Sequence, residues 1–260
     1  MSLWIICLLC IVQGLTEFLP ISSSGHLTLV EQLFGIEDNL LLINLFLHLA
    51  TLVAVIVVYR KIIWKLIKKP FQPLTYKLII STLFTCIISL IFEYFSLESL
   101  SFKIYSFGFL ITSILLFLMD RINRKSVIIK QGGVSYKDSI FVGIVQGLAV
   151  IPGLSRSGRT IATLTICGNN DEESAEYSFL LSIPVIIGGF VLELFKMYKN
   201  IEISNIFTIE SCVFAFFLTF IIAFVSLKLT LKLLKKKKFI YFSIYTFLLF
   251  ILTFILNFII

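Results

Sequence analysis

Hydrophobic residues occur along this chain in long stretches that are separated by short polar segments. Six of these stretches are long enough to cross a bilayer as helices, which takes roughly 20 residues each. The predicted spans are 40–59, 76–95, 103–119, 176–195, 209–227 and 239–260. The pattern therefore predicts an all-α integral membrane protein with six transmembrane helices.

Two further apolar stretches are interrupted by polar residues. The first, 3–34, contains Pro20 and a run of serines, and the second, 140–167, contains Pro152 followed by serines and arginines. Non-helical backbone at membrane depth is tolerated only where protein or a water-filled cavity surrounds it. We therefore expect two re-entrant helix pairs, each with a half-helix entering the membrane, a polar turn and a half-helix returning to the same side.

The two interrupted stretches carry one repeated pattern. Gln-Gly-Leu begins at Gln13 and again at Gln146, and a Ser/Gly-rich run begins at Ser22 and again at Ser155. The offset from 13 to 146 equals the offset from 22 to 155, and the same shift brings the first three spans close to the last three. We expect a single membrane domain, 1–260, with repeat one at 1–119, a linker at 120–138 and repeat two at 139–260.

The basic residues predict the orientation of the repeats. Of the 22 Lys and Arg residues, 17 lie in the segments 60–77, 121–137 and 228–238. The positive-inside rule places all three segments in the cytoplasm, provided that both interrupted stretches are re-entrant. Each half then has an odd number of crossings, which gives an inverted-topology repeat with a site at the repeat interface. The net charge of +7 is thus explained by orientation, and we expect no nucleic-acid partner.

The polar groups in the two turns indicate a site, because they would be costly to place in lipid. Glu17 lies one helical turn after Gln13, and Arg156 in the other turn is its expected partner. Serine-capped helix starts bind anions through backbone N–H groups, and arginine matches phosphate oxygens, so a diphosphate fits. The expected substrate-binding residues are Gln13, Ser22, Ser24, Gly25, Ser155, Ser157, Gly158, Arg159 and Thr160.

The chain has only two histidines. His26 follows Ser23 by three positions, which favours activation of the hydroxyl by a general base. The alternative is a neutral, hydrogen-bonded His26 at a helix end. His48 lies within the first full span, where we expect it to bond between helices, and the alternative is that it reaches the site. Glu193 lies near the end of a span, where contact with headgroups and water suffices.

Residues 13–26 and 152–160 resemble the two signatures of the bacterial undecaprenyl-diphosphatases of the bacitracin-resistance type. The resemblance implies a hydrolase of the bacterial plasma (inner) membrane that converts undecaprenyl diphosphate to undecaprenyl phosphate and phosphate. This carrier lipid is reused in peptidoglycan synthesis, and its recycling raises tolerance of bacitracin. The family motif begins with Glu or Gln, here Gln13, so a mechanism with two acidic residues at this place is in conflict with the sequence. Glu17 alone carries the acidic role.

The predicted catalytic residues are Glu17, Ser23, His26 and Arg156. Ser23 attacks the terminal phosphorus with His26 as base, or His26 is itself the nucleophile. Glu17 orients His26 or Arg156, or binds a divalent cation, Mg²⁺ or Ca²⁺, that bridges the phosphates. We expect no organic cofactor. The expected partners are a polyprenyl diphosphate, membrane lipids and a second copy in a homodimer, with the site open to the periplasmic or extracellular side.

The main alternative is a lipid-phosphate flippase or anion transporter, because broken helices in inverted repeats are typical of secondary transporters. Such a protein would use the same arginines and serines without a reactive Ser23 or His26. The lipid phosphatases with paired histidines are set aside, because no histidine follows Arg156. A non-catalytic scaffold does not explain the doubled polar turns.

Overall fold

The computed structural model describes residues 2–36, 40–94, 102–124, 130–148, 153–200 and 209–259. Within these ranges the chain forms α-helices and no β-strand. The helices are α1 (Leu3–Thr16), α2 (Ser23–Leu33), α3 (Leu41–Val58), α4 (Arg60–Lys68), α5 (Pro73–Tyr94), α6 (Phe102–Arg124), α7 (Tyr136–Gly147), α8 (Arg156–Ile166), α9 (Asp171–Asn200), α10 (Ile209–Leu234) and α11 (Phe239–Ile259). The all-α prediction is therefore confirmed.

Five helices are long and apolar enough to cross a membrane, and six if α3 and α4 form one bent span. Every predicted span coincides with one of these helices, since uninterrupted apolar length is what a spanning helix requires. Large apolar side chains such as Ile79, Leu83 and Leu248 are exposed on them. In a bilayer these side chains face lipid, so the chain is a multi-pass membrane protein.

Helix α4 was expected only as part of a basic loop. Tyr59 leaves helical geometry (φ −95°, ψ 15°), and α4 continues at an angle of 78° to α3. The helix buries none of its residues, and it exposes Trp64 and Ile67 beside its lysines and arginine. Aromatic and basic residues on one short amphipathic helix are typical of the membrane–water interface.

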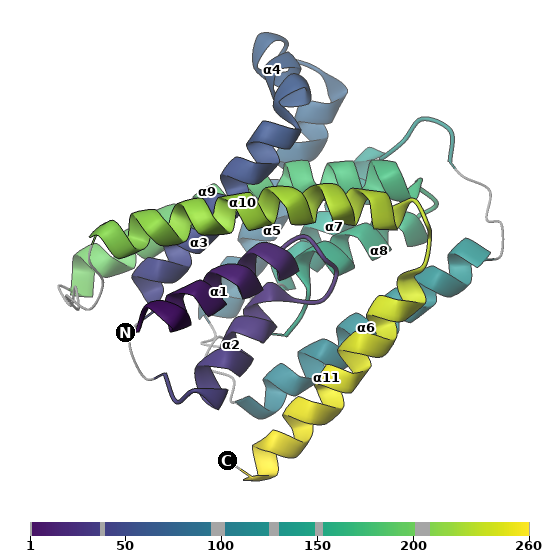
Figure 1. Cartoon of the computed structure of the whole chain (residues 1–260). Helices are drawn as coiled ribbons and strands as arrows, with labels where there is room; N and C mark the ends of the chain where they lie inside the picture. The colour runs from purple at the N-terminus through teal and green to yellow at the C-terminus, as the bar shows by residue number, and fades with distance from the viewer. Residues whose placement is uncertain are drawn as a thin grey trace.

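The long helices hold two short helix pairs between them (Figure 1). Helix α10 packs along α1 and α3, α7 packs against α5, and α6 lies alongside α11. A buried cluster that includes Phe18, Ile161 and Phe179 joins the first polar turn to α8 and α9. The apolar core thus fixes both polar turns against long helices.

The short pairs α1–α2 and α7–α8 occupy equivalent places in the sequence. The shift that relates Gln13 to Gln146 also carries the bounds of α2, 23–33, onto those of α8, 156–166. It likewise carries the first residue of α1 onto the first residue of α7. Between the pairs, α6 continues to Arg124 and α7 begins at Tyr136, so both helices extend into the segment expected as a linker.

Candidate active site

The two polar turns pack directly against each other. The Ser157 hydroxyl donates to the carbonyl of Leu19 at 3.2 Å, which joins one turn to the other. A Cβ added to Gly25 would lie 3.1 Å from the Cα of Gly153, and one added to Gly158 would lie 3.3 Å from the Cβ of Pro20. The turns therefore meet at glycines, where the absence of a side chain permits the close approach.

Both turns use the same kind of cap hydrogen bond, although the backbone of the capping residue differs: φ is 71° at Ser22 and −64° at Ser155. The Ser22 hydroxyl accepts from the Gly25 N–H at 3.2 Å, and the Ser155 hydroxyl accepts from the Gly158 N–H at 3.0 Å. Each serine thereby satisfies one of the free N–H groups at the start of α2 or α8. The first residue after the cap is Ser23 in α2 and Arg156 in α8.

An ion pair joins the two halves of the chain, as the sequence predicted. Nη2 of Arg156 donates to Oε1 of Glu17, and their side chains are 18% and 4% exposed. Glu17 follows the last residue of α1, and Arg156 is the first residue of α8. Carboxylates are disfavoured at the C-terminal end of a helix and cations at the N-terminal end. Each charge therefore stands where its own helix disfavours it, and the pairing offsets that cost.

The second oxygen of Glu17 accepts two hydrogen bonds. The Ser23 hydroxyl donates to Oε2 at 2.6 Å, and Nε2 of Gln13 donates to the same oxygen at 3.0 Å. A serine hydroxyl has one proton, so the proton of Ser23 is directed at Glu17. Gln13 is fully buried, and its amide supports the carboxylate without adding a second negative charge. The first position of the family motif is Glu or Gln. The hydrogen bond to Glu17 explains why a glutamine at this position, Gln13, is compatible with the site.

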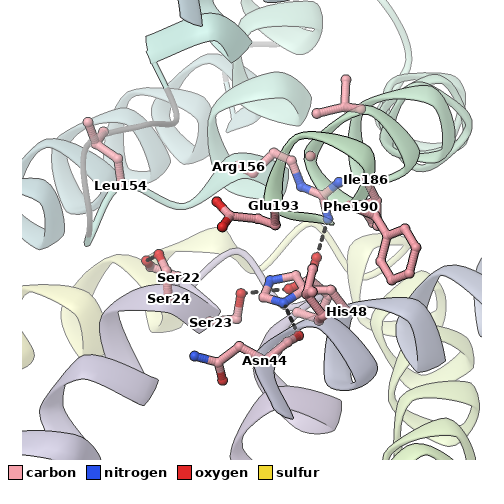
Figure 2. A pocket seen from close by; sticks show the side chains of 14 residues that line it. Ser22, Ser23, Ser24, Asn44, His48, Leu154, Arg156, Ile186, Phe190 and Glu193 are labelled. Atoms are coloured by element: carbon pink, nitrogen blue, oxygen red, sulfur yellow. Dashed lines mark hydrogen bonds and ion pairs between the residues drawn. The ribbon is translucent and has the colours of Figure 1, made fainter. Parts of the chain in front are cut away.

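These groups open onto a cavity of about 450 Å³ between the two turns, α3 and α9 (Figure 2). Five residues predicted for the site line it: Glu17, Ser22, Ser23, Ser24 and Arg156. The rest of the lining is mostly apolar: Leu45 lies on α3, Leu154 lies in the second turn, and Val185, Ile186 and Phe190 lie on α9. The cavity thus combines polar groups where the turns meet with apolar side chains on α3 and α9, which suits a phosphorylated lipid.

His26 was predicted as a catalytic base, but it does not line this cavity. Its Nδ1 bonds to the Ser22 carbonyl at 2.6 Å, and its Nε2 bonds to the Tyr245 hydroxyl of α11 at 2.8 Å. A carbonyl only accepts, so Nδ1 carries the proton and Nε2 accepts from the tyrosine. Both ring nitrogens of His26 are therefore engaged within the protein.

Arg159 occupies the position in the second turn that His26 occupies in the first, and it makes the same kind of bond. Its Nε donates to the Ser155 carbonyl at 3.1 Å, and its Nη1 donates to the Val145 carbonyl at 3.1 Å. His26 and Arg159 thus both reach back to the carbonyl of their own capping serine. Arg159 is 2% exposed and lies behind the second turn, outside the lining of the cavity.

The remaining predicted residues support the turns from behind. Thr160 donates to the carbonyls of Arg156 and Ser157 and shares a hydrogen bond with Ser178 of α9. Ser155 caps α8, and a Cβ on Gly25 would collide with the ring of Phe109 at 2.6 Å. These residues hold the second turn to α9 and the first turn to α6.

Three polar residues on the cavity wall lie outside the predicted site: Asn44 and His48 of α3, and Glu193 of α9. Nδ1 of His48 donates to the Asn44 carbonyl at 2.8 Å, a bond within α3, so the expected bond between helices was wrong for this nitrogen. Figure 2 shows His48 facing the same space as Ser23 and Arg156. The sequence contained one indication of these positions: each is a polar side chain inside an apolar span, which by default indicates a functional position.

The residues fit a divalent cation only together with a phosphate ligand. The described residues contain no group of three or more His, Cys, Asp or Glu side chains that could hold a metal ion. Both oxygens of Glu17 are already engaged, and Glu193 is the other carboxylate on the cavity wall. Mg²⁺ commonly binds through one or two carboxylates plus substrate phosphates, so a diphosphate would supply most of its ligands.

Comparison with known proteins gives a consistent result. A family model described as "Bacitracin resistance protein BacA" matches residues 6–252. A protein of Carboxydothermus hydrogenoformans named undecaprenyl-diphosphatase is 44% identical over 185 residues, which are 71% of this chain and 70% of that protein. A protein of Thermosipho melanesiensis with the same name is 42% identical over 214 residues, which are 80% of this chain and 82% of that protein. Undecaprenyl-diphosphatase 4 of Bacillus thuringiensis is 39% identical over 192 residues, 73% of each chain.

Proposed function

The chain belongs to the BacA family of bacitracin resistance proteins, and we propose that it hydrolyses undecaprenyl diphosphate to undecaprenyl phosphate and inorganic phosphate. The product is the lipid carrier that cell-wall synthesis reuses. Bacitracin acts by sequestering the diphosphate, so expression of the protein is expected to raise bacitracin tolerance.

One observation carries this proposal: Ser23, Glu17 and Arg156 form a connected group on the wall of a single cavity. A hydroxyl with an adjacent proton acceptor is the arrangement of an activated nucleophile. The arginine fork suits a phosphoryl group, and the start of α8 adds a partial positive charge. The apolar wall on α9 suits the first isoprene units of the lipid.

In the first step, the Ser23 oxygen attacks the terminal phosphorus and its proton passes to Glu17. The bond between this phosphorus and the bridging oxygen breaks, and undecaprenyl phosphate leaves. The diphosphate competes with Glu17 for Arg156, so substrate binding itself makes the carboxylate a better proton acceptor. The geometry supports Glu17 as the acceptor in place of His26, because the Ser23 hydroxyl donates to Glu17 at 2.6 Å.

In the second step, water attacks the phosphoserine and releases phosphate, and Ser23 regains its proton from Glu17. A divalent cation, Mg²⁺ or Ca²⁺, bound to the diphosphate and to Glu17 or Glu193 would neutralise phosphate charge. Arg156 orients the terminal phosphate throughout. His26 holds the first turn to α11 in this scheme, through its bond to Tyr245.

Hydrolysis is favoured over transport, because the three relatives above all carry the name of a diphosphatase. The direct test is phosphate release from undecaprenyl diphosphate by the purified protein in detergent, where transport cannot occur. Release that is lost in Ser23→Ala supports the proposal. Substrate binding without any release, in the presence of Mg²⁺ or Ca²⁺, would contradict it.

We further propose that α1–α2 and α7–α8 are re-entrant pairs in an inverted repeat, in the bacterial plasma membrane. The equal offsets of the helices support this, and so does the packing of α1 on α10, which has its counterpart in the packing of α7 on α5. The cavity then opens to the periplasmic or extracellular side. The test is labelling of single cysteines by an impermeant reagent in intact cells. Phe34→Cys is expected to react, and Lys65→Cys is expected to react only after permeabilisation. The reverse pattern would contradict the orientation.

A homodimer also stays a proposal. The measurement is the mass of the detergent-purified protein by light scattering, after subtraction of bound detergent. A mass close to twice that of the 260-residue chain supports the dimer, and a mass of one chain contradicts it.

A further inference from the structure

The two histidines of the chain differ in which ring nitrogen remains available. In His26, Nδ1 and Nε2 bond to Ser22 and Tyr245, and the ring is stacked on Tyr245 with centroids 5.7 Å apart. In His48, Nδ1 donates to the Asn44 carbonyl at 2.8 Å, which fixes the proton of the neutral ring on that nitrogen. Nε2 of His48 therefore carries a lone pair, and the described residues supply no hydrogen bond to it.

His48 also lies where a reacting group is needed. It is half-buried on α3, on the cavity wall that includes Ser23, Glu17 and Arg156. Figure 2 shows its ring in the same cavity as the Ser23 hydroxyl and the Arg156 guanidinium. A substrate phosphate held by Arg156 and attacked by Ser23 would therefore lie in the space that His48 faces.

The hydrogen bonds indicate that Glu17 and His48 accept protons in different steps of the reaction. Ser23 has one proton and donates it to Glu17 at 2.6 Å, so the first step leaves His48 unused. The second step consumes a water molecule, which must also lose a proton. Glu17 is then protonated and cannot take it, which leaves Glu193 and the imidazole of His48 as proton acceptors on the described cavity wall. Histidine is the side chain that most often serves as a general base.

We infer that His48 is the catalytic base for hydrolysis of the phosphoserine, an inference that rests on the covalent mechanism proposed above. The water oxygen forms a bond to phosphorus as the bond from phosphorus to the Ser23 oxygen breaks. One water proton passes to Nε2 of His48, and the Ser23 oxygen takes the proton held by Glu17. Phosphate leaves, and His48 returns its proton to solvent through the cavity.

The test uses the full chain in detergent and undecaprenyl diphosphate labelled with ³²P in the terminal phosphate. His48→Ala and His48→Gln are compared with the wild type, and both products are measured during the first turnover. We expect each variant to form about one equivalent of undecaprenyl phosphate at close to the normal rate. Label is then expected to accumulate on Ser23, with phosphate release slowed about 100-fold in His48→Ala. Glutamine can orient water without accepting a proton, so we expect at least about 10-fold slowing in His48→Gln.

The matched control is His26→Gln, which alters the other histidine behind the same turn. It is expected to lower activity without accumulating label, because the ring of His26 bonds to Ser22 and Tyr245 and does not line the cavity. Normal phosphate release by both His48 variants would overturn the inference. Equal slowing of both products without label would also overturn it, because His48 would then act in the first step. Full activity of Ser23→Ala would overturn the covalent step itself, and the inference with it.

Discussion

The two polar turns share a hydrogen-bonding pattern, but they differ in the side chain at the first residue of the helix that follows. Both have a capping serine, a glycine at the contact with the opposite turn, and a side chain that bonds back to the capping carbonyl. At the first residue after the cap, one turn presents the hydroxyl of Ser23 and the other presents the guanidinium of Arg156. The same cap hydrogen bond thus presents a hydroxyl in one turn and a positive charge in the other.

The ion pair between Glu17 and Arg156 makes the two turns a single site. Neither turn contains both the proton acceptor and the cation, so neither repeat could form this group of residues alone. A buried ion pair is weak evidence for a stabilising role, because its desolvation offsets its attraction. Its place beside Ser23 instead favours a functional role, and the following variants separate the two contributions.

Removal of the Ser23 hydroxyl, the proposed nucleophile, is expected to have the largest effect on phosphate release. Ser23→Ala should lower phosphate release at least about 10³-fold, because no other described side chain donates to Glu17 from that position. The measurement is initial-rate phosphate release from undecaprenyl diphosphate. Thr28→Ala is the control on the same helix, since its hydroxyl bonds to the Ser24 carbonyl. Comparable losses in both variants would assign the effect to α2 as a whole.

Substitution of Arg156 in the second turn is expected to lower activity by a smaller factor than Ser23→Ala. Arg156→Lys keeps the charge but loses the planar fork, and we expect about a 10²-fold loss in kcat/KM. Arg156→Ala should in addition destabilise the fold by about 3 kcal/mol, because it leaves Glu17 buried without its partner.

A double variant distinguishes stability from catalysis at this pair. Glu17→Gln combined with Arg156→Gln should recover most of the lost stability, measured by thermal unfolding in detergent, and none of the activity. Arg121→Ala is the control, since Arg121 is exposed and lies over the ring of Phe117. Recovered activity in the double variant would show that the pair is only structural.

A second carboxylate in the first turn should make the activity of the protein depend more strongly on a divalent cation. Gln13→Glu places two acidic groups at about the distance of the present 3.0 Å bond, where they repel unless a proton or a cation lies between them. We expect about a 10-fold stronger inhibition by a chelator than in the wild type, reversed by Mg²⁺ or Ca²⁺. Equal sensitivity of both proteins to the chelator would count against a cation at Glu17.

The capping serines should give the smallest effects. Ser22→Ala and Ser155→Ala each remove one cap bond, which is worth about 1 kcal/mol. We expect a small decrease in thermal stability for each variant, because each loses the same kind of cap hydrogen bond. A decrease confined to one variant would show that the cap hydrogen bond stabilises only one of the two turns.

Much of the fold follows from local features of the sequence. Apolar length located α3, α5, α6, α9, α10 and α11, and the constant offset between the two copies of the repeated pattern anticipated the matching bounds of α2 and α8. The bend at Tyr59 was missed, because a basic loop and an interfacial helix have the same composition. The proximity of Glu17 and Arg156 was predictable, since two opposite buried charges need partners.

The sequence alone determined the helices, their repeat and the charged pair, because these depend on hydrophobic length, spacing and the cost of an unpaired charge in lipid. Tertiary structure decided which polar side chains reach the cavity. It turned His26 towards Tyr245 and placed His48 and Glu193 on the cavity wall. The rotation of a helix about its axis is fixed by packing against distant segments, and no local pattern of residues records it.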